Sequence, residues 1–151
     1  MQTKIRAITL ALLSLLWSGN ALADGKAEPI NKNADGVALR GYDAVAYFTE
    51  GKALKGQPQW QHEWAGAKWR FASAANRDLF AKDPAKYAPQ FGGYCAWAVS
   101  NNYTYDADPE LWKIVNGKLY VNYNQLARFR WERDIPGRIK LAEQYWPQLH
   151  K

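Results

Sequence analysis

Sulfur and imidazole groups are scarce in this chain of 151 residues. It contains one cysteine, one methionine and two histidines, and the methionine is its first residue. Cys95, His62 and His150 are therefore the only soft ligand groups beyond Met1. A lone cysteine cannot form a disulfide within the chain, and closed soft-metal sites or Cys–His nucleophiles need several such groups together. Any thiol or soft-metal chemistry must depend on Cys95 or His62.

Long hydrophobic runs are also missing. The longest apolar stretch, residues 7–17, is too short to cross a bilayer comfortably. It follows a basic start and is followed by small residues that end in Ala21-Leu22-Ala23. This order predicts a secretory signal peptide over residues 1–23, cleaved after Ala23. We therefore expect a soluble periplasmic or secreted product with no membrane insertion once the leader is removed.

Charge of either sign is moderate, whereas aromatic residues are abundant. The chain has 20 basic and 14 acidic residues without a basic run, so we expect no nucleic-acid partner. Eight tryptophans, nine tyrosines and five phenylalanines provide large apolar areas for a core that no disulfide supports. Aromatic side chains can also line a pocket for a ring or a cation.

The pattern along the chain predicts an α+β fold, in which a small antiparallel sheet built from hairpins packs with short helices. Residues 24–40 are polar and contain turn formers, so they are expected to form an extended N-terminal lead-in. Residues 41–149 follow as one α+β domain. Strands are expected over 44–49 and 94–99. Helices are expected over 74–82, from Asp83-Pro84 to Pro89, over about 124–133, and from Asp134 to a stop at Trp146-Pro147.

Two hairpins are the clearest local predictions. In the first, over residues 60–73, a turn at Gly66-Ala67 would place Trp64 opposite Trp69 and His62 opposite Phe71. One apolar face would then carry five side chains: Trp60, His62, Trp64, Trp69 and Phe71. In the second hairpin, Asn116-Gly117 is a strong type I′ signal, and it pairs Ile114 with Leu119 and Trp112 with Val121.

Cys95 and His62 are the candidate metal ligands, and no residue is assigned a catalytic role. Each also has a structural interpretation, because free cysteines are often buried and core histidines are common. The candidate ligand-binding residues are His62, Cys95, Trp60, Trp64, Phe71 and Tyr94. Tyr103 and Tyr105 lie in a polar loop, where function is frequent. The nearby carboxylates Asp106, Asp108 and Glu110 give only a weak hard-cation pattern.

Several pieces of the chain together resemble the YHS domain family. They are Tyr42–Phe48, His62 before a hairpin, Phe71–Ser73 and Leu79–Tyr87. The continuation through Phe91–Ala96 and Gly117–Tyr120 is similar to exported, single-domain bacterial members. The resemblance implies a small metal-binding module for copper or another heavy metal. It also implies relatives that are attached to metal-transporting ATPases and to some hydroxylases.

The thiols of the cysteine-bearing members of that family are absent here. This chain has Ala46, Ala72 and Asn76 where those members carry cysteine. The resemblance therefore leaves His62 and Cys95 as ligands of an incomplete site that a partner, a second copy or solvent would complete.

We expect a periplasmic binding or accessory protein rather than an enzyme. Its ligand would be a copper ion or another transition metal, and its partner another periplasmic protein. Two alternatives stay open at this point. One is a small-molecule binding module with an aromatic-lined pocket around His62. The other is a redox sensor or enzyme that uses the Cys95 thiol.

Overall fold

The computed structural model describes residues 25–151, so the predicted leader lies outside the described residues. The helices and strands follow in this order: η1 (Leu39–Gly41), α1 (Ala46–Thr49), β1 (Gln57–Trp64), β2 (Ala67–Phe71), α2 (Ala74–Lys82), α3 (Pro84–Tyr87), η2 (Phe91–Gly93), α4 (Ala96–Val99), β3 (Asp108–Val115), β4 (Lys118–Asn122), α5 (Gln125–Glu132) and α6 (Ile135–Leu149). This is the α+β fold that the sequence predicts. Within residues 25–151, no helix is both long and apolar enough to span a membrane.

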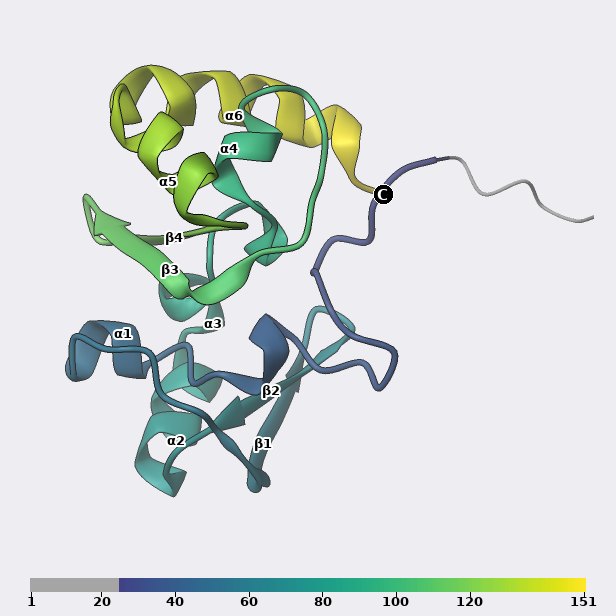
Figure 1. Ribbon diagram of the computed structural model, residues 1–151. Helices are drawn as coiled ribbons and strands as arrows, with labels where there is room; N and C mark the ends of the chain where they lie inside the picture. The colour runs from purple at the N-terminus through teal and green to yellow at the C-terminus, as the bar shows by residue number, and fades with distance from the viewer. Residues whose placement is uncertain (1–24) are drawn as a thin grey trace, which may run out of the picture.

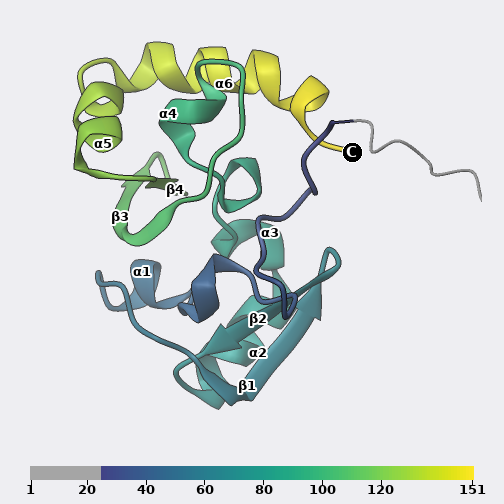
Figure 2. The ribbon, with the colours of Figure 1, turned by 45° about the vertical axis from the view of Figure 1, so that its right-hand side comes forward.

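The two hairpins form two separate two-stranded sheets rather than one. Hairpin β1–β2 lies with α2 in the lower half of the molecule, whereas β3–β4 lies beneath α4, α5 and α6 in the upper half (Figure 1). The segment that precedes η1 runs from the C-terminal end of α6 down to β2 (Figure 2). It is anchored at both ends, because Ala27 donates to Leu149 O at 2.8 Å and Ala38 donates to Lys68 O at 2.9 Å.

The first hairpin forms with a different register from the predicted one. Its turn is Ala65-Gly66, with φ of 51° and 73°, so both central residues have the positive φ of a type I′ turn. His62 therefore pairs with Trp69 rather than with Phe71. The residue opposite His62 is thus two positions earlier in β2 than predicted. Because side chains alternate between the two faces of a strand with a period of two, a shift of two residues leaves every side chain on the predicted face. The apolar face thus survives the error in register.

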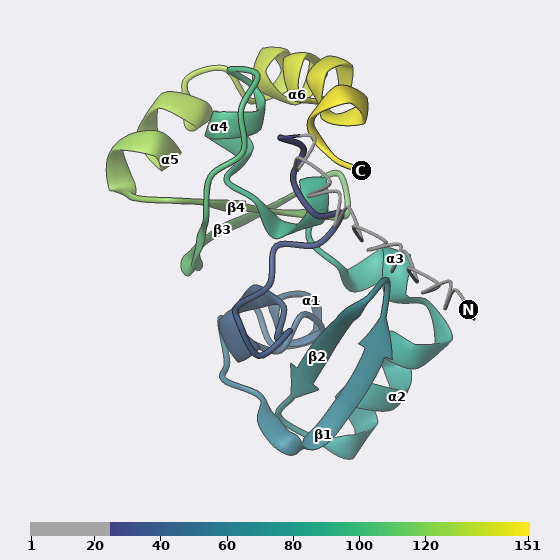
Figure 3. The same ribbon diagram turned by 90° about the vertical axis from the view of Figure 1, so that its right-hand side faces the viewer.

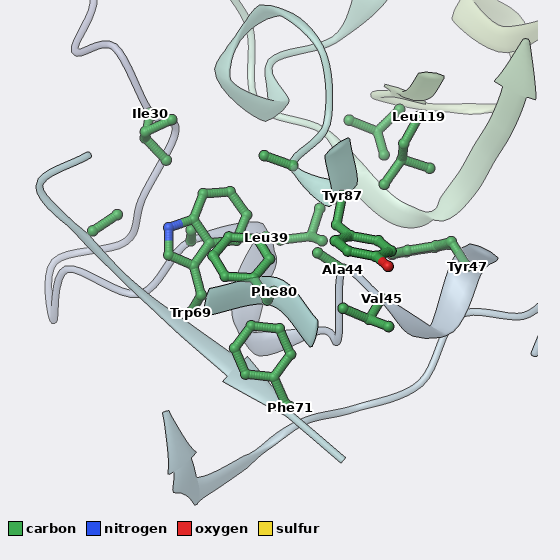
Figure 4. Packing of buried hydrophobic residues seen from close by; sticks show 14 of the residues in the cluster. Ile30, Leu39, Ala44, Val45, Tyr47, Trp69, Phe71, Phe80, Tyr87 and Leu119 are labelled. Atoms are coloured by element: carbon green, nitrogen blue, oxygen red, sulfur yellow. The ribbon is translucent and has the colours of Figure 1, made fainter. Parts of the chain in front are cut away.

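The aromatic side chains of this face pack against α2, which lies alongside both strands (Figure 3). Phe80 of α2 is fully buried, and its ring centroid lies 5.0 Å from those of both Trp69 and Phe71. Figure 4 shows these three rings together, with Leu119 of the other hairpin reaching the same cluster beyond Tyr87. Helix α2 begins as predicted, since Ser73 Oγ accepts a hydrogen bond from Asn76 N–H.

The second hairpin has the predicted register, with Ile114 opposite Leu119 and Trp112 opposite Val121. Its strand β4 is buried on both faces. Leu119 and Val121 belong to the lower core, whereas Tyr120 packs against Trp131 beneath the upper helices. Strand β4 therefore joins the two halves of the molecule.

Two predicted strands are helical instead, and one helix is longer than predicted. In segment 44–49, the Asp43 carboxylate accepts hydrogen bonds from the backbone amides of Val45 and Ala46, and helix α1 begins there. In segment 94–99, the Trp97 amide donates to a side chain of β4, and helix α4 forms. Helix α6 continues through Pro147 to Leu149. There Trp146 packs on Phe91, and Leu149 O accepts the amide of Ala27.

Asp43 is a fully buried carboxylate that joins three parts of the lower half. Its Oδ1 accepts the amides of Val45 at 2.8 Å and Ala46 at 3.1 Å. Its Oδ2 accepts the Ala72 amide and Asn76 Nδ2, both at 2.8 Å. Four donors compensate for the loss of water around the charge. The carboxylate thus holds α1, the end of β2 and the first turn of α2 together.

We expect Asp43→Asn to lower the free energy of unfolding by about 2–4 kcal/mol, because an amide nitrogen would replace one acceptor oxygen and face buried donors. Urea denaturation measures the change. The same substitution at the exposed Asp35 is the matched control and should change stability by less than about 0.5 kcal/mol. Equal effects of the two substitutions would contradict this role for Asp43.

Candidate ligand-binding site

The predicted site residues of the first hairpin lie around a filled core rather than an open space. His62 is half-buried, and its ring centroid lies 6.1 Å from that of Phe80. The ring centroid of Trp64 lies 6.0 Å from that of Phe80, and Phe71 is fully buried against Phe80. Trp60 lies at the edge of this face, where the Arg77 guanidinium stands 5.4 Å from its ring. Phe80 therefore occupies the space between these aromatic groups.

Cys95 belongs to another part of the molecule. It forms a small buried cluster with Ala98 of α4 and Ala127 of α5 in the upper half. Its neighbour Tyr94 packs near Trp146 instead, with ring centroids 6.0 Å apart. The structure thus places His62 and Cys95 in separate clusters and does not bring them together.

The Cys95 thiol is held by two polar neighbours at the end of β4. Its Sγ lies 3.6 Å from Asn122 Oδ1 and accepts a hydrogen bond from the Tyr123 amide at 3.3 Å. The side chain is 1% exposed. Burial raises the pKa of this thiol, and the surrounding backbone hydrogen bonds offset the effect only in part. The thiol is therefore neutral at pH 7, which gives no support to a thiolate-based redox enzyme.

Asn122 positions α4 above β4. Its side chain is buried, and Oδ1 accepts the Trp97 amide at 3.0 Å. One carboxamide oxygen thus contacts both the thiol and the first turn of α4. This bond directs the chain from Cys95 into α4, so that Trp97 lies beside α5 rather than on a strand of the sheet.

An open hollow of about 230 Å³ lies directly above Cys95. We call it the tyrosine hollow. Its larger lining side chains are those of Trp97, Tyr103, Tyr105, Tyr123, Leu126 and Arg130, with Cys95 and Ala127 among the smaller ones. The tyrosines come from the loop after α4 and from the end of β4, and the rest come from α4 and α5.

The tyrosine rings of the hollow are unusually accessible for large aromatic groups. Tyr103, Tyr105 and Tyr123 are 46%, 49% and 42% exposed. Tyr105 and Tyr123 meet edge to face with ring centroids 4.5 Å apart. A hydrogen bond with Tyr123 raises the pKa of the Tyr105 hydroxyl, so this hydroxyl stays protonated at pH 7. The hollow therefore presents ring surfaces and hydroxyl groups to solvent.

The residues between 25 and 151 do not form a closed metal site. No three histidine, cysteine, aspartate or glutamate side chains of this part of the chain converge on one point. Asp106 is paired with Arg40 and also accepts a hydrogen bond from Asn31. Its partial burial opposes ionisation, but these hydrogen bonds lower its pKa overall. Glu110 accepts the Tyr42 hydroxyl, so these loop carboxylates serve local contacts.

Sequence reasoning did not single out Asn122, Tyr123 or Arg130. Asn122 is the last residue of β4, and Tyr123 directly precedes the residue that caps α5. Polar groups in such connecting segments often carry function. In the sequence, Asn122 is marked only by its place as the polar residue that directly follows the apolar run Leu119–Val121. Tyr103 and Tyr105 were singled out for their place in a loop, and they line the hollow.

Residues 45–91 match the family model of the YHS domain. This finding confirms the resemblance over the segment from the start of α1 to the start of η2. His62 lies inside the matched segment, whereas Cys95 and the tyrosine hollow lie beyond its end. Searches of curated proteins and of solved structures each found no match.

We expect Cys95 of the folded protein to react with iodoacetamide at pH 7.5 more than about tenfold more slowly than an exposed thiol, because the thiol is enclosed and its burial raises its pKa, which lowers the fraction of reactive thiolate. A single-thiol reference is the double variant Cys95→Ser/Ala75→Cys, since Ala75 is exposed on α2. Denaturation should abolish the difference. Equal rates in the two folded proteins would show that the Cys95 thiol is accessible and activated.

Proposed function

We propose that this protein, whose residues 45–91 match the YHS domain, is a periplasmic binding protein that holds a small aromatic molecule in the tyrosine hollow. The observation that carries the proposal is the set of half-exposed rings around an open space of about 230 Å³. The proposed compartment depends on the predicted leader. Of the two alternatives to metal binding, the aromatic pocket is the one the geometry supports, although it lies at Cys95 rather than at His62.

The physical reason is that exposed aromatic surface is costly and is relieved by a bound ring. Burial of apolar area contributes roughly 25 cal/mol per Å², and edge-to-face ring contacts add to this. Tyr105 and Tyr123 already meet in such a contact, and Tyr103 and Trp97 provide further faces. The tyrosine hydroxyls can orient a polar substituent of the ligand. Cys95 lies beneath the hollow, with its buried thiol bonded to Asn122 and to the Tyr123 amide.

Filling the hollow should weaken binding. Ala127 lines it from α5, so Ala127→Leu would place an isobutyl group in the space of about 230 Å³. We expect this change to weaken the binding of 4-methylphenol at least about tenfold, as measured by calorimetry and by the NMR shift of the Trp97 indole N–H. Ala75→Leu, on the exposed face of α2, is the matched control. No saturable binding to the parent protein, or equal affinity in both variants, would reject the proposal.

Metal binding through His62 is the second candidate, because this residue is the one soft ligand inside the matched YHS segment. Its imidazole is half-buried at the edge of the core. Among residues 25–151, neither of its ring nitrogens has a hydrogen-bond partner. A transition-metal ion could bind there if a partner or a second copy supplied further ligands. Cys95 does not fit this role, since its thiol is enclosed and hydrogen-bonded.

We expect His62→Ala to weaken binding of Cu²⁺ or Zn²⁺ at least about tenfold, as measured by calorimetric titration of the mature protein. His150→Ala is the matched control, because His150 stacks on Trp146 at 4.2 Å and hydrogen-bonds its carbonyl oxygen. Metal binding that is unsaturable, or unaffected by His62→Ala, would remove this candidate.

A further inference from the structure

A second depression adjoins the tyrosine hollow. It has a volume of about 430 Å³ and is lined by Trp97, Arg130, Arg133, Asp134 and Arg138. Trp97 and Arg130 line both spaces, so the two lie side by side. We call the three arginines Arg130, Arg133 and Arg138 the arginine shelf. It lies where α5 ends and α6 begins, next to α4.

The arginines of the shelf have no carboxylate partners. Among the other arginines of residues 25–151, Arg40 is paired with Asp106, Arg77 with Asp78 and Arg128 with Glu132, whereas Arg70 bonds to the Gln61 side chain. No comparable ion pair involves a shelf arginine within residues 25–151. The one carboxylate that lines the depression, Asp134, uses Oδ1 to cap α6 by accepting the Gly137 amide at 3.1 Å. The shelf therefore carries an excess of positive charge beside the hollow.

Trp97 holds two of these charges in place. The Arg138 guanidinium lies 4.1 Å from the indole centroid and that of Arg130 lies 6.0 Å from it. Arg138 also approaches Asn101 Oδ1 at 3.5 Å. Stacking on an aromatic ring orients a guanidinium while leaving its edge free to donate, and that edge matches the two oxygens of a carboxylate. Two like charges near one ring repel each other, and an anion between them would relieve this repulsion.

We propose that the ligand is a small aromatic carboxylate, whose ring enters the tyrosine hollow while its carboxylate lies on the arginine shelf. This inference rests on the proposed function and adds the charge of the ligand to it. The small volume of the hollow and its position directly beside the shelf favour a compact anion over an extended polymer. Arg130 is the central specificity residue, because it lines both spaces.

The test compares the binding of two probes of nearly the same shape to the mature protein: the anion phenylacetate and the neutral amide phenylacetamide. We expect phenylacetate to bind at least about tenfold more tightly, as a charge-assisted hydrogen bond predicts. Added salt should weaken phenylacetate binding and leave phenylacetamide binding unchanged. Arg130→Gln and Arg138→Gln should each remove most of the preference for the carboxylate. Arg77→Gln, which changes a paired arginine of α2, is the matched control and should keep it.

The outcomes separate this inference from the proposed function. Equal binding of the two probes overturns the role of the arginine shelf and leaves the aromatic hollow standing. Failure of both probes and of 4-methylphenol overturns the hollow as well. A preference for phenylacetate that survives in Arg130→Gln and Arg138→Gln, with folding verified by circular dichroism, places the anion elsewhere and rejects the inference.

Discussion

Strand β4 is the constraint on which the rest of the structure depends, because from Leu119 to Asn122 it is buried on both faces. Leu119 and Val121 complete the lower core, while Tyr120 and Asn122 lie beneath the upper helices. A strand buried on both faces can be covered only if helices pack on one side and a second layer on the other. The hairpin β3–β4 thus forces the two halves of the chain together, and it places its own polar end, Asn122, in the interior.

The buried end of β4 creates the site. A carboxamide in the interior must be hydrogen-bonded, and Asn122 meets this demand through the Trp97 amide and the Cys95 thiol. Those contacts turn the chain into α4 and aim Trp97 toward α5 and α6, where it contacts Arg130 and Arg138. The tyrosine hollow and the arginine shelf are therefore consequences of how the buried side chain of Asn122 finds its hydrogen-bond partners. Asp43, just before the YHS-matched segment, performs a similar structural task in the lower half by accepting donors from that segment.

The matched segment and the proposed site occupy different parts of the chain. The YHS match covers the lower hairpin and α2, where Phe80 fills the space between the aromatic side chains. The hollow is built from residues after position 94. The YHS segment therefore contributes a compact base, and the later part of the chain carries the open aromatic surface. His62 is the one soft ligand that this base retains.

Local signals in the sequence were sufficient for the elements whose contacts lie within a few residues. Asn116-Gly117 set the second hairpin, and Ser73, Asn124 and Asp134 cap helices by accepting amides three residues ahead. Two-residue alternation identified the buried face of the first hairpin even though its register was wrong. Only the tertiary structure decided the rest. Segment 94–99 became helical because the Trp97 amide donates to Asn122, 25 positions away. Segment 44–49 became helical because Asp43, which accepts its first amides, is itself held by Asn76, 33 positions away. Because such distant partners leave no periodic trace in the sequence, the tyrosine hollow above Cys95 could not be predicted without the fold, whereas the burial of this lone cysteine was already one of the interpretations that the sequence offered.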